Sequence, residues 1–570
     1  MLTDNAMQIL KVRYLLRDAK GMVRESPNQL FRRVAKSVAS AEEVDRATWE
    51  TQFYKIMASL EFLPNSPTLM NAGLPNGQLS ACFVLPIEDS LAGIFTTLKN
   101  AALIHQSGGG TGYNFSKLRP KDDPVSLLGG KSSGPIAFLK LYDAGTEYVK
   151  QGGKRRGANM GILNVNHPDI QEFITSKTDG NSLQNFNISV GITDDFMHAI
   201  ENQEDWKLIN PRTGKAQKTA KATSIWNSII QEAWKTGDPG LIFLDSINRA
   251  SPIPKQGSIQ STNPCGEVPL LDFESCNLGS LNLTKVLIKD GGKVEINWPK
   301  LETNIQIAMR FLDNVISVNH YLLPRIKKVS NANRKVGLGV MGWAELLLLL
   351  EIPYASEEAV KLGEQLMQFI GTKSYETSKD LAQERGVFLS WEESSYAPNK
   401  PMRNATCNSI APTGTISVIA NTSYSIEPLY ALAYKRVGVL EDQTQTEINP
   451  IFMEKMQRFG LWNEKIKAEV LQSGSIQQIP SIPTEIKKLF ETSLEIPWEY
   501  HLLHQRAFQK HTDNAVSKTI NLPVGTNLKE ISEIYQKAWE YGLKGITIYR
   551  DKSKTRQVLQ KCNFNSAAAC

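Results

Sequence analysis

A thiol, a carboxylate and a carboxamide lie within five residues of one another at positions 263–267, which read Asn-Pro-Cys-Gly-Glu. A second thiol, Cys276, lies eleven positions after Cys265. Proline before a cysteine and glycine after it fit poorly in a helix or a central strand. We therefore expect Cys265 at the tip of a loop, where its thiol reaches into a cavity. This combination of groups indicates redox chemistry at a single centre.

The size and charge of the chain restrict the kind of protein that it can be. A chain of 570 residues can bury a large core, and its 64 basic and 58 acidic residues leave a net charge of +6. This mild excess suits a phosphate-binding pocket and gives no indication of a nucleic-acid partner. We find no signal peptide and no apolar run of about 18 residues, so we expect a soluble cytoplasmic protein without a membrane span.

The cysteine content points away from a structural disulfide framework. Six cysteines are few for this length, and a reducing compartment disfavours disulfides. We expect Cys407 to be a small buried hydrophobic residue, and the thiols with a function to be catalytic or metal-binding. No metal site is evident, because Cys562 and Cys570 alone are too sparse for a four-ligand zinc site.

The apolar pattern divides the chain into helical and mixed regions. Residues 1–60 show a helical period, which predicts a small N-terminal helical cap. From there to about residue 550, short apolar runs alternate with helical stretches and Gly-rich turns, which is typical of an α/β core. Three Gly-rich segments fit neither the phosphate loop of nucleotide hydrolases nor the dinucleotide fingerprint. They lie at residues 107–112, 129–134 and 152–157.

The pentapeptide at 263–267 resembles the finger loop of ribonucleotide reductase catalytic subunits. Further segments resemble this family in the same order, and the match covers about residues 1–555. These segments are Asn65–Thr68, Ser80–Cys82, Glu274–Gly279, Ala411–Ser417 and Asn514–Thr519. The resemblance implies a ten-stranded α/β barrel of two halves with the finger loop at its centre. It implies a cap without an ATP-cone at residues 1–60, the barrel at 61–550 and a flexible redox tail at 551–570.

The resemblance assigns the chemistry residue by residue. Cys265 would become a thiyl radical and remove the hydrogen atom at C3′ of the substrate ribose. Glu267 would accept the proton of the 3′-hydroxyl, and Asn263 would hydrogen-bond the sugar hydroxyls. Cys82 and Cys276 would supply two electrons and end as a disulfide. Because these two thiols are 194 positions apart, the fold must bring their Cα atoms within about 7 Å.

The resemblance also implies a substrate site. Thr413, Gly414, Thr415 and Ser417 would offer hydroxyl and backbone N–H donors to the substrate phosphates, at the start of a helix. Ser66 resembles a further contact with phosphate or sugar. The expected substrate is a ribonucleoside diphosphate, and the expected reductant is thioredoxin or glutaredoxin.

Regulation in this family uses a deoxynucleoside triphosphate or ATP effector at the interface of a homodimer. Asp89 resembles the carboxylate that holds the effector ribose. Arg119 falls on the first of two signalling loops, and Arg156 falls on the second, between effector and substrate. We therefore expect a homodimer with an effector site near these residues.

Two radical sources are compatible with the sequence. The core, at residues 108–115 and 412–415, most resembles the adenosylcobalamin-dependent class. The chain length and the terminal thiols Cys562 and Cys570 instead resemble compact class I subunits, which are served by a separate dimetal-carboxylate β subunit. We favour this two-subunit interpretation, with no cofactor tightly bound to the chain, and keep adenosylcobalamin as the alternative. Tyr549 would relay the radical, although class I subunits usually have two adjacent tyrosines there.

Two other interpretations predict different residues. A glycyl-radical enzyme would need a C-terminal glycyl loop, and the end of the chain offers only Gly542 and Gly545 before the cysteine-bearing tail. A non-catalytic nucleotide-binding protein on the same fold would have lost at least one of the three central thiols or Glu267. All four residues are present.

Overall fold

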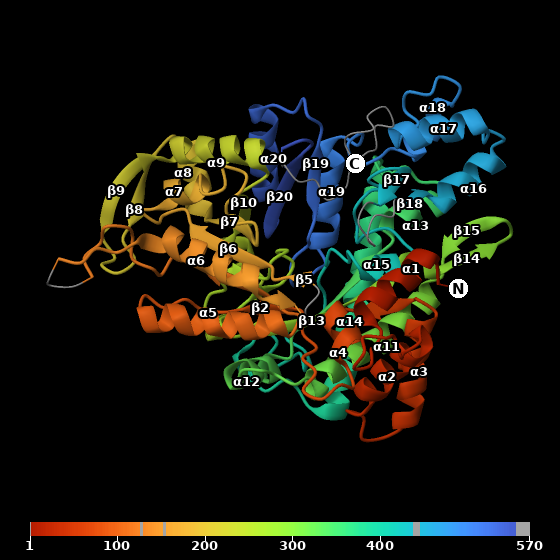
Figure 1. Cartoon of the computed structure of the whole chain (residues 1–570), viewed down its shortest axis with the longest axis horizontal. Coiled ribbons are helices and arrows are strands. Elements are labelled where there is room, and N and C mark those ends of the chain that lie inside the picture. Colours follow the sequence, from red (N-terminus) through yellow and green to blue (C-terminus); the bar gives the residue numbers. More distant parts are fainter. Residues whose placement is uncertain (1, 126–128, 152–154, 437–444, 554–570) are drawn as a thin grey trace.

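One ten-stranded sheet forms the centre of the molecule (Figure 1). The computed structural model describes residues 2–125, 129–151, 155–436 and 445–553. Nine strands follow one path in the order β1-β13-β2-β3-β6-β7-β10-β20-β19, and β16 pairs with β13. The strands are β1 (Phe62–Pro64), β2 (Cys82–Val84), β3 (Gly110–Asn114), β6 (Asn159–Asn164), β7 (Phe186–Ile192), β10 (Gly240–Phe243), β13 (Ser275–Asn282), β16 (Val336–Met341), β19 (Thr519–Leu522) and β20 (Gly545–Arg550).

Apart from β1, which pairs antiparallel with β13, the strands form two parallel sets that run in opposite directions. β2, β3, β6, β7 and β10 are parallel, whereas β13 pairs antiparallel with β2, and β20 pairs antiparallel with β10. Isolated bridges from Leu338 to Asn408 and from Ile410 to Val516 continue from β16 to the segment that leads into β19. The sheet therefore closes on itself, which removes its open edges. The predicted α/β barrel of ten strands in two halves is confirmed.

Helices cover the outside of the barrel because parallel neighbouring strands need a crossover connection. No helix in the described part of the chain has the length and apolar content needed to cross a membrane. Figure 1 shows α5 and α6 beside the first half, and α11 and α14 beside the second. The main helices are α5 (Leu91–Gln106), α6 (Gly134–Tyr148), α9 (Ala222–Thr236), α11 (Trp298–Val318), α14 (Glu357–Arg385), α19 (Trp498–Gln509) and α20 (Leu528–Glu540).

The N-terminal region is helical and packs on the second half of the barrel. It contains α1 (Asp4–Ile9), α2 (Pro27–Ala39) and α3 (Arg46–Ala58), and both longer helices contact α11. The sequence fixes the start of α2, because Ser26 and Gln29 form a capping box and Pro27 takes the first helical position.

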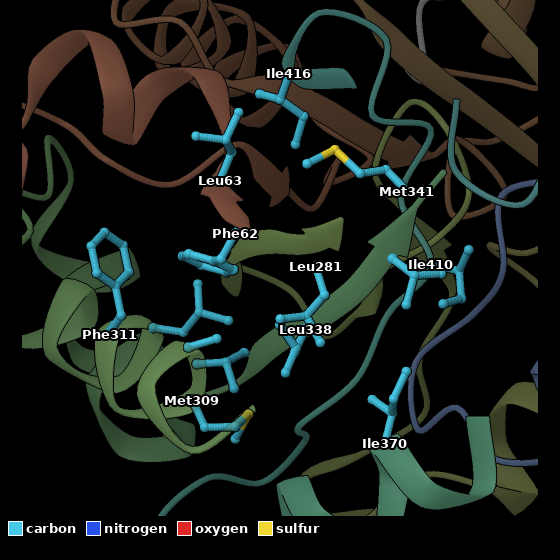
Figure 2. Close-up of a cluster of buried hydrophobic side chains, with 14 of the residues drawn as sticks. Phe62, Leu63, Leu281, Met309, Phe311, Leu338, Met341, Ile370, Ile410 and Ile416 are labelled. Atoms are coloured by element: carbon cyan, nitrogen blue, oxygen red, sulfur yellow. The ribbon is translucent and has the colours of Figure 1, made fainter. Parts of the chain in front are cut away.

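Aromatic and aliphatic side chains join this region to the barrel (Figure 2). Phe311 of α11 meets Phe53 of α3 and Phe62 of β1 edge to face, with ring centroids 5.2 and 5.4 Å away. In Figure 2, Leu281 of β13 and Leu338 of β16 lie close to one another in the same cluster. The helical region and the second half of the barrel therefore share one core.

A buried charge cluster reinforces the same junction. Glu42, between α2 and α3, is buried and accepts hydrogen bonds from Arg310, Asn314 and Arg385. Burial alone would raise the pKa of Glu42, but these three partners together lower it. The cluster thus contributes stability above the ordinary glutamate pKa and loses it as pH falls through the lowered value.

We predict that Glu42→Gln lowers the free energy of unfolding by about 3 kcal/mol, since it removes the buried carboxylate on which Arg310 and Arg385 converge. The exposed neighbour Glu43 provides a matched control, because Glu43→Gln removes the same charge without a buried partner. Urea titration at pH 7 measures both variants. Equal midpoints for the two variants would contradict a structural role for the cluster.

Candidate active site

A short hairpin carries Cys265 into the barrel. β11 (Ser261–Thr262) pairs antiparallel with β12 (Pro269–Leu270), and residues 263–268 form the tip. The hairpin lies directly on β3, because a Cβ at Gly112 would be only 1.7 Å from the Thr262 oxygen. From the second half of the barrel, Ala515 N–H donates to the Glu267 carbonyl. The tip is therefore held from both halves.

The tip itself is a tight turn. Gly266 N–H donates to the Asn263 carbonyl at 3.1 Å, and Gly266 has a φ of +80°, which favours glycine. The Asn263 side-chain oxygen accepts a hydrogen bond from Val268 N–H at 3.0 Å. Cys265 projects from this turn and is exposed, so it lies on a loop tip as predicted.

Cys82 and Cys276 lie directly opposite each other, on β2 and β13 in antiparallel register. Opposed residues of antiparallel strands have Cα atoms about 4.5–5.5 Å apart, which is within the range of a disulfide. Both are buried free thiols. Burial raises the pKa of both thiols, and the carboxyl of Glu267 adds to each shift. The thiols therefore stay protonated at neutral pH and can act as hydrogen donors.

Glu267 is a buried carboxyl whose Oε2 has no hydrogen-bond partner in the described part of the chain. Burial raises the pKa of Glu267 to about 7, and the side chain of Asn263 opposes this shift. A carboxyl with a pKa near neutrality is suited to proton transfer at physiological pH. Asn263 also donates to Cys82 Sγ at 3.2 Å, so it connects the turn to the thiol pair.

The hairpin tip faces a cavity of about 280 Å³, which we call the thiol cavity. It brings together residues that the sequence analysis assigned to catalysis and to substrate binding. Two of the expected residues do not line it. Cys276 lies opposite Cys82 on the adjacent strand without reaching the wall, and Ser417 is fully buried. The expected residues on its wall are Ser66, Cys82, Asn263, Cys265, Glu267, Thr413, Gly414 and Thr415.

Some of the groups expected to bind phosphate at residues 413–417 are not available at the cavity, because they are buried or hydrogen-bonded within the protein. Thr413 has a left-handed φ of +55°, and its hydroxyl accepts a hydrogen bond from Ser425 N–H at 2.8 Å. The following helix, α15 (Ile416–Ile419), has only four residues. Ser417 lies within α15, and no described residue hydrogen-bonds its hydroxyl. The side chains of this loop at the cavity wall are therefore those of Thr413, Thr415 and Ile416.

Several cavity residues were not predicted from the sequence. Arg13 and Tyr14 reach the wall from the N-terminal region, and Asn65 lies beside Ser66. Tyr14 Oη and Ser66 Oγ are 2.7 Å apart and share a hydrogen bond. Asn65 Nδ2 is buried with no hydrogen-bond partner among the described residues. Asn65 lies within a segment that resembles the family, whereas no motif marks Arg13 or Tyr14.

Cys265 also lines a second cavity of about 310 Å³, which we call the distal cavity. Its walls come from β7, β10 and β20 and from residues 516–519. Lys518 is buried in this wall and forms an ion pair with Glu427. Burial lowers the pKa of Lys518, and Glu427 opposes the shift. The remaining polar side chains of the wall include Asn187, Ser189, Ser517, Thr519 and Thr547.

The structure brings two of the three expected effector residues together. Arg119 Nε donates to Asp89 Oδ2 at 2.8 Å, and Arg119 N–H donates to Asp89 Oδ1 at 3.1 Å. About a quarter of each side chain remains exposed. Arg156 belongs to the short strand β5 (Arg155–Arg156), and its side chain lies outside what the structure describes.

Tyr549 lies on β20, opposite Asn521 of β19. Its neighbours Gly545, Ile546 and Thr547 line the distal cavity, but Tyr549 does not. Cys562 and Cys570 fall outside the described residues.

Comparisons with known proteins agree with this geometry. The all-alpha domain of ribonucleotide reductase matches residues 1–77, and its barrel domain matches residues 80–549. The chain is 48% identical to a vitamin B12-dependent ribonucleoside-diphosphate reductase of Thermoplasma acidophilum, over 98% of this chain and 80% of that protein. It is 47% identical to the protein of that name from Mycobacterium tuberculosis, over 97% of this chain and 80% of the other.

A solved structure has the same fold over nearly the whole chain. The alpha subunit of the Actinobacillus ureae class Id ribonucleotide reductase is similar with a TM-score of 0.79 and 26% identity, and the match covers 97% of both chains. The family match, the barrel and the threaded cysteine hairpin together show that this chain belongs to the ribonucleotide reductase large subunits.

Proposed function

We propose that this chain reduces ribonucleoside diphosphates to 2′-deoxyribonucleoside diphosphates through a thiyl radical on Cys265. One observation carries the proposal: Cys265 lines both cavities, and one of them also contains an acid and a thiol. The relatives named as ribonucleoside-diphosphate reductases support the choice of a diphosphate.

Each catalytic residue of the thiol cavity has a separate role in the reaction. The Cys265 radical takes the C3′ hydrogen, and ionised Glu267 accepts the proton of the 3′-hydroxyl. Asn263 hydrogen-bonds the sugar hydroxyls while it holds the turn. The 2′-hydroxyl then leaves as water, which is easier from a sugar radical with a base beside it than from a closed-shell sugar.

The electrons come from the cross-strand thiol pair. Cys82 and Cys276 give up two hydrogen atoms, the C2′–OH bond is replaced by C2′–H, and one disulfide and one water are formed. At the end of the cycle Cys265 returns the hydrogen atom to C3′, which regenerates its own thiyl radical. A dithiol protein such as thioredoxin or glutaredoxin would then reduce the disulfide.

We propose adenosylcobalamin as the radical source. The B12-dependent relatives favour this alternative over the two-subunit interpretation that we drew from chain length and terminal thiols. When bound, this cofactor supplies an organic radical that can oxidise a thiol. The distal cavity fits its adenosyl group, because neutral hydroxyl and amide side chains in the wall suit a nucleoside and Cys265 lies at the same wall. Asn187, Ser517, Thr519 and Thr547 would hold that group.

A class I mechanism is the second candidate. The similarity to a class Id alpha subunit over 97% of the chain favours it, and Tyr549 on β20 would then carry the radical towards Cys265. A separate dimetal subunit would be the partner in this case.

We also propose a homodimer that binds a deoxynucleoside triphosphate near Asp89 and Arg119, with Arg156 as a contact on the second loop. Apolar side chains on α5 and α6 support the dimer, because Leu91 is 67% exposed, Phe95 52% and Tyr148 87%. A chain that sediments as a monomer in the presence of effector would contradict the dimer.

We predict that the purified chain with adenosylcobalamin and a small dithiol converts cytidine diphosphate to its deoxy form. Cys265→Ala should abolish turnover but leave nucleotide binding unchanged, and Cys407→Ala, at a buried thiol outside both cavities, is the control. Product analysis by chromatography measures the outcome. Turnover only after addition of a dimetal subunit would support the second candidate, and turnover by Cys265→Ala would refute the thiyl radical.

We predict that kcat/KM rises with pH and levels off above about 7, because Glu267 must be ionised to accept a proton. Glu267→Gln should lower kcat by about 100-fold or more. Burial and Glu495 also raise the pKa of Glu491 to about 7, but Glu491 does not line either cavity, so Glu491→Gln should retain the wild-type profile. A wild-type rate that is constant from pH 5.5 to 8 would exclude Glu267 as the base.

We predict that one turnover without reductant produces one Cys82–Cys276 disulfide per chain. Alkylation of the denatured chain followed by peptide mapping detects the disulfide. Cys407 should remain a free thiol and should therefore be found alkylated before and after turnover. Cys276→Ser should lose multiple turnover with thioredoxin. Full multiple turnover in this variant would remove Cys276 from the redox pair.

A further inference from the structure

The N-terminal region places an arginine at the wall of the thiol cavity. Residues Leu10–Tyr14 form one π-helical turn that follows α1, and Leu15 N–H donates to the Leu10 carbonyl at 2.9 Å. π-turns occur often at functional sites. Leu10 and Tyr14 are buried in the core, whereas the side chain of Arg13 is exposed at the cavity.

This turn is fixed against both parts of the expected phosphate site. α1 contacts α15, the helix that follows the phosphate loop, and Figure 1 shows the two side by side. Tyr14 shares its hydrogen bond with Ser66, at the start of α4 (Ser66–Asn71). Arg13 therefore follows a helix that packs on α15, precedes the residue that bonds Ser66, and lines the same cavity as residues 413–415.

The negative charges of a diphosphate substrate call for a cationic side chain at the wall of the thiol cavity. Among the described residues that line the thiol cavity, Arg13 is the only lysine or arginine, and Glu267 is the only carboxyl. A nucleoside diphosphate carries at least two negative charges on its phosphates, and a dehydrated anion is costly without a cation. α15 has four residues, so its dipole contributes little, and the Thr413 hydroxyl already accepts a hydrogen bond from Ser425 N–H.

Arg13 is also the arginine of this region that has no partner among the described residues. The structure gives Arg13 no hydrogen bond or ion pair with any described residue. Each of the other arginines before residue 60 has a carbonyl, a carboxylate or an aromatic ring as a partner: Arg17, Arg24, Arg32, Arg33 and Arg46. Asn65 Nδ2, buried in the same wall, is a second donor without a partner in the described chain.

We propose that Arg13 binds the terminal phosphate of the substrate and so makes the site selective for a diphosphate over a monophosphate. The inference rests on the proposed function for the identity of the substrate. The planar guanidinium of Arg13 can form two parallel hydrogen bonds to a phosphate, which a lysine cannot reproduce. Asn65 and the backbone of residues 413–415 would supply neutral donors around the same group.

The test compares Arg13→Gln with Lys11→Gln, which removes the same charge from an exposed residue in the same turn but outside the cavity. Arg13→Gln should raise KM for cytidine diphosphate about tenfold to a hundredfold, the effect of one charge-assisted hydrogen bond, and change kcat less than threefold. The preference for the diphosphate over the monophosphate in competition should shrink by the same factor. Arg13→Lys should recover part of the loss, and Lys11→Gln should behave as wild type.

Direct binding separates this inference from the proposed function. Calorimetric titration of each purified variant with cytidine diphosphate and then with cytidine monophosphate needs no turnover. A weaker diphosphate affinity in Arg13→Gln, with unchanged monophosphate affinity and unchanged melting temperature, supports the inference even if the wild-type chain is inactive. Diphosphate affinity or KM within twofold of wild type in Arg13→Gln would overturn it.

Discussion

The contact between the cysteine hairpin and β3 is the constraint on which the rest of the site depends. Gly112 has no side chain, so the Thr262 carbonyl can lie where a Cβ would otherwise be. Any larger residue would push the hairpin away from the barrel wall and move Cys265 relative to both cavities. The precise position of one sulfur atom thus follows from the absence of one methyl group on the opposite strand.

The second half of the barrel completes this placement and sets the protonation of the site. Ala515 fixes the Glu267 backbone, and the closed barrel buries most of the surface of Glu267, Cys82 and Cys276. Burial is the main cause of each raised pKa, so the same enclosure yields neutral thiols and a carboxyl that titrates near neutrality. A thiol that gives a hydrogen atom and an acid that exchanges a proton need this dry environment.

Much of this arrangement could be predicted from the sequence, because local chemistry decides it. Proline and glycine around Cys265 exclude helix and central strand, and the alternation of elements indicates an α/β core. The pairing of Cys82 with Cys276 came from family resemblance, since register between distant strands is a tertiary property. The hydrogen bonds between Asp89 and Arg119 could not be predicted for the same reason.

Two residues of the expected substrate site show more clearly what could not be predicted from the sequence. Ser417 belongs to a recognisable motif, yet the short helix α15 turns its side chain into the interior. Arg13 belongs to no motif, because its position depends on a π-turn and on the packing of α1 against α15, about 410 positions later.

The location of Cys265 between two cavities has a consequence for the order of events. Cys265 lines both cavities, so a molecule in only one of them would cover only part of its surroundings. Molecules in both cavities together would cover the sulfur more completely, without any movement of the hairpin. A reactive radical formed there would be best protected from quenching when both molecules are in place.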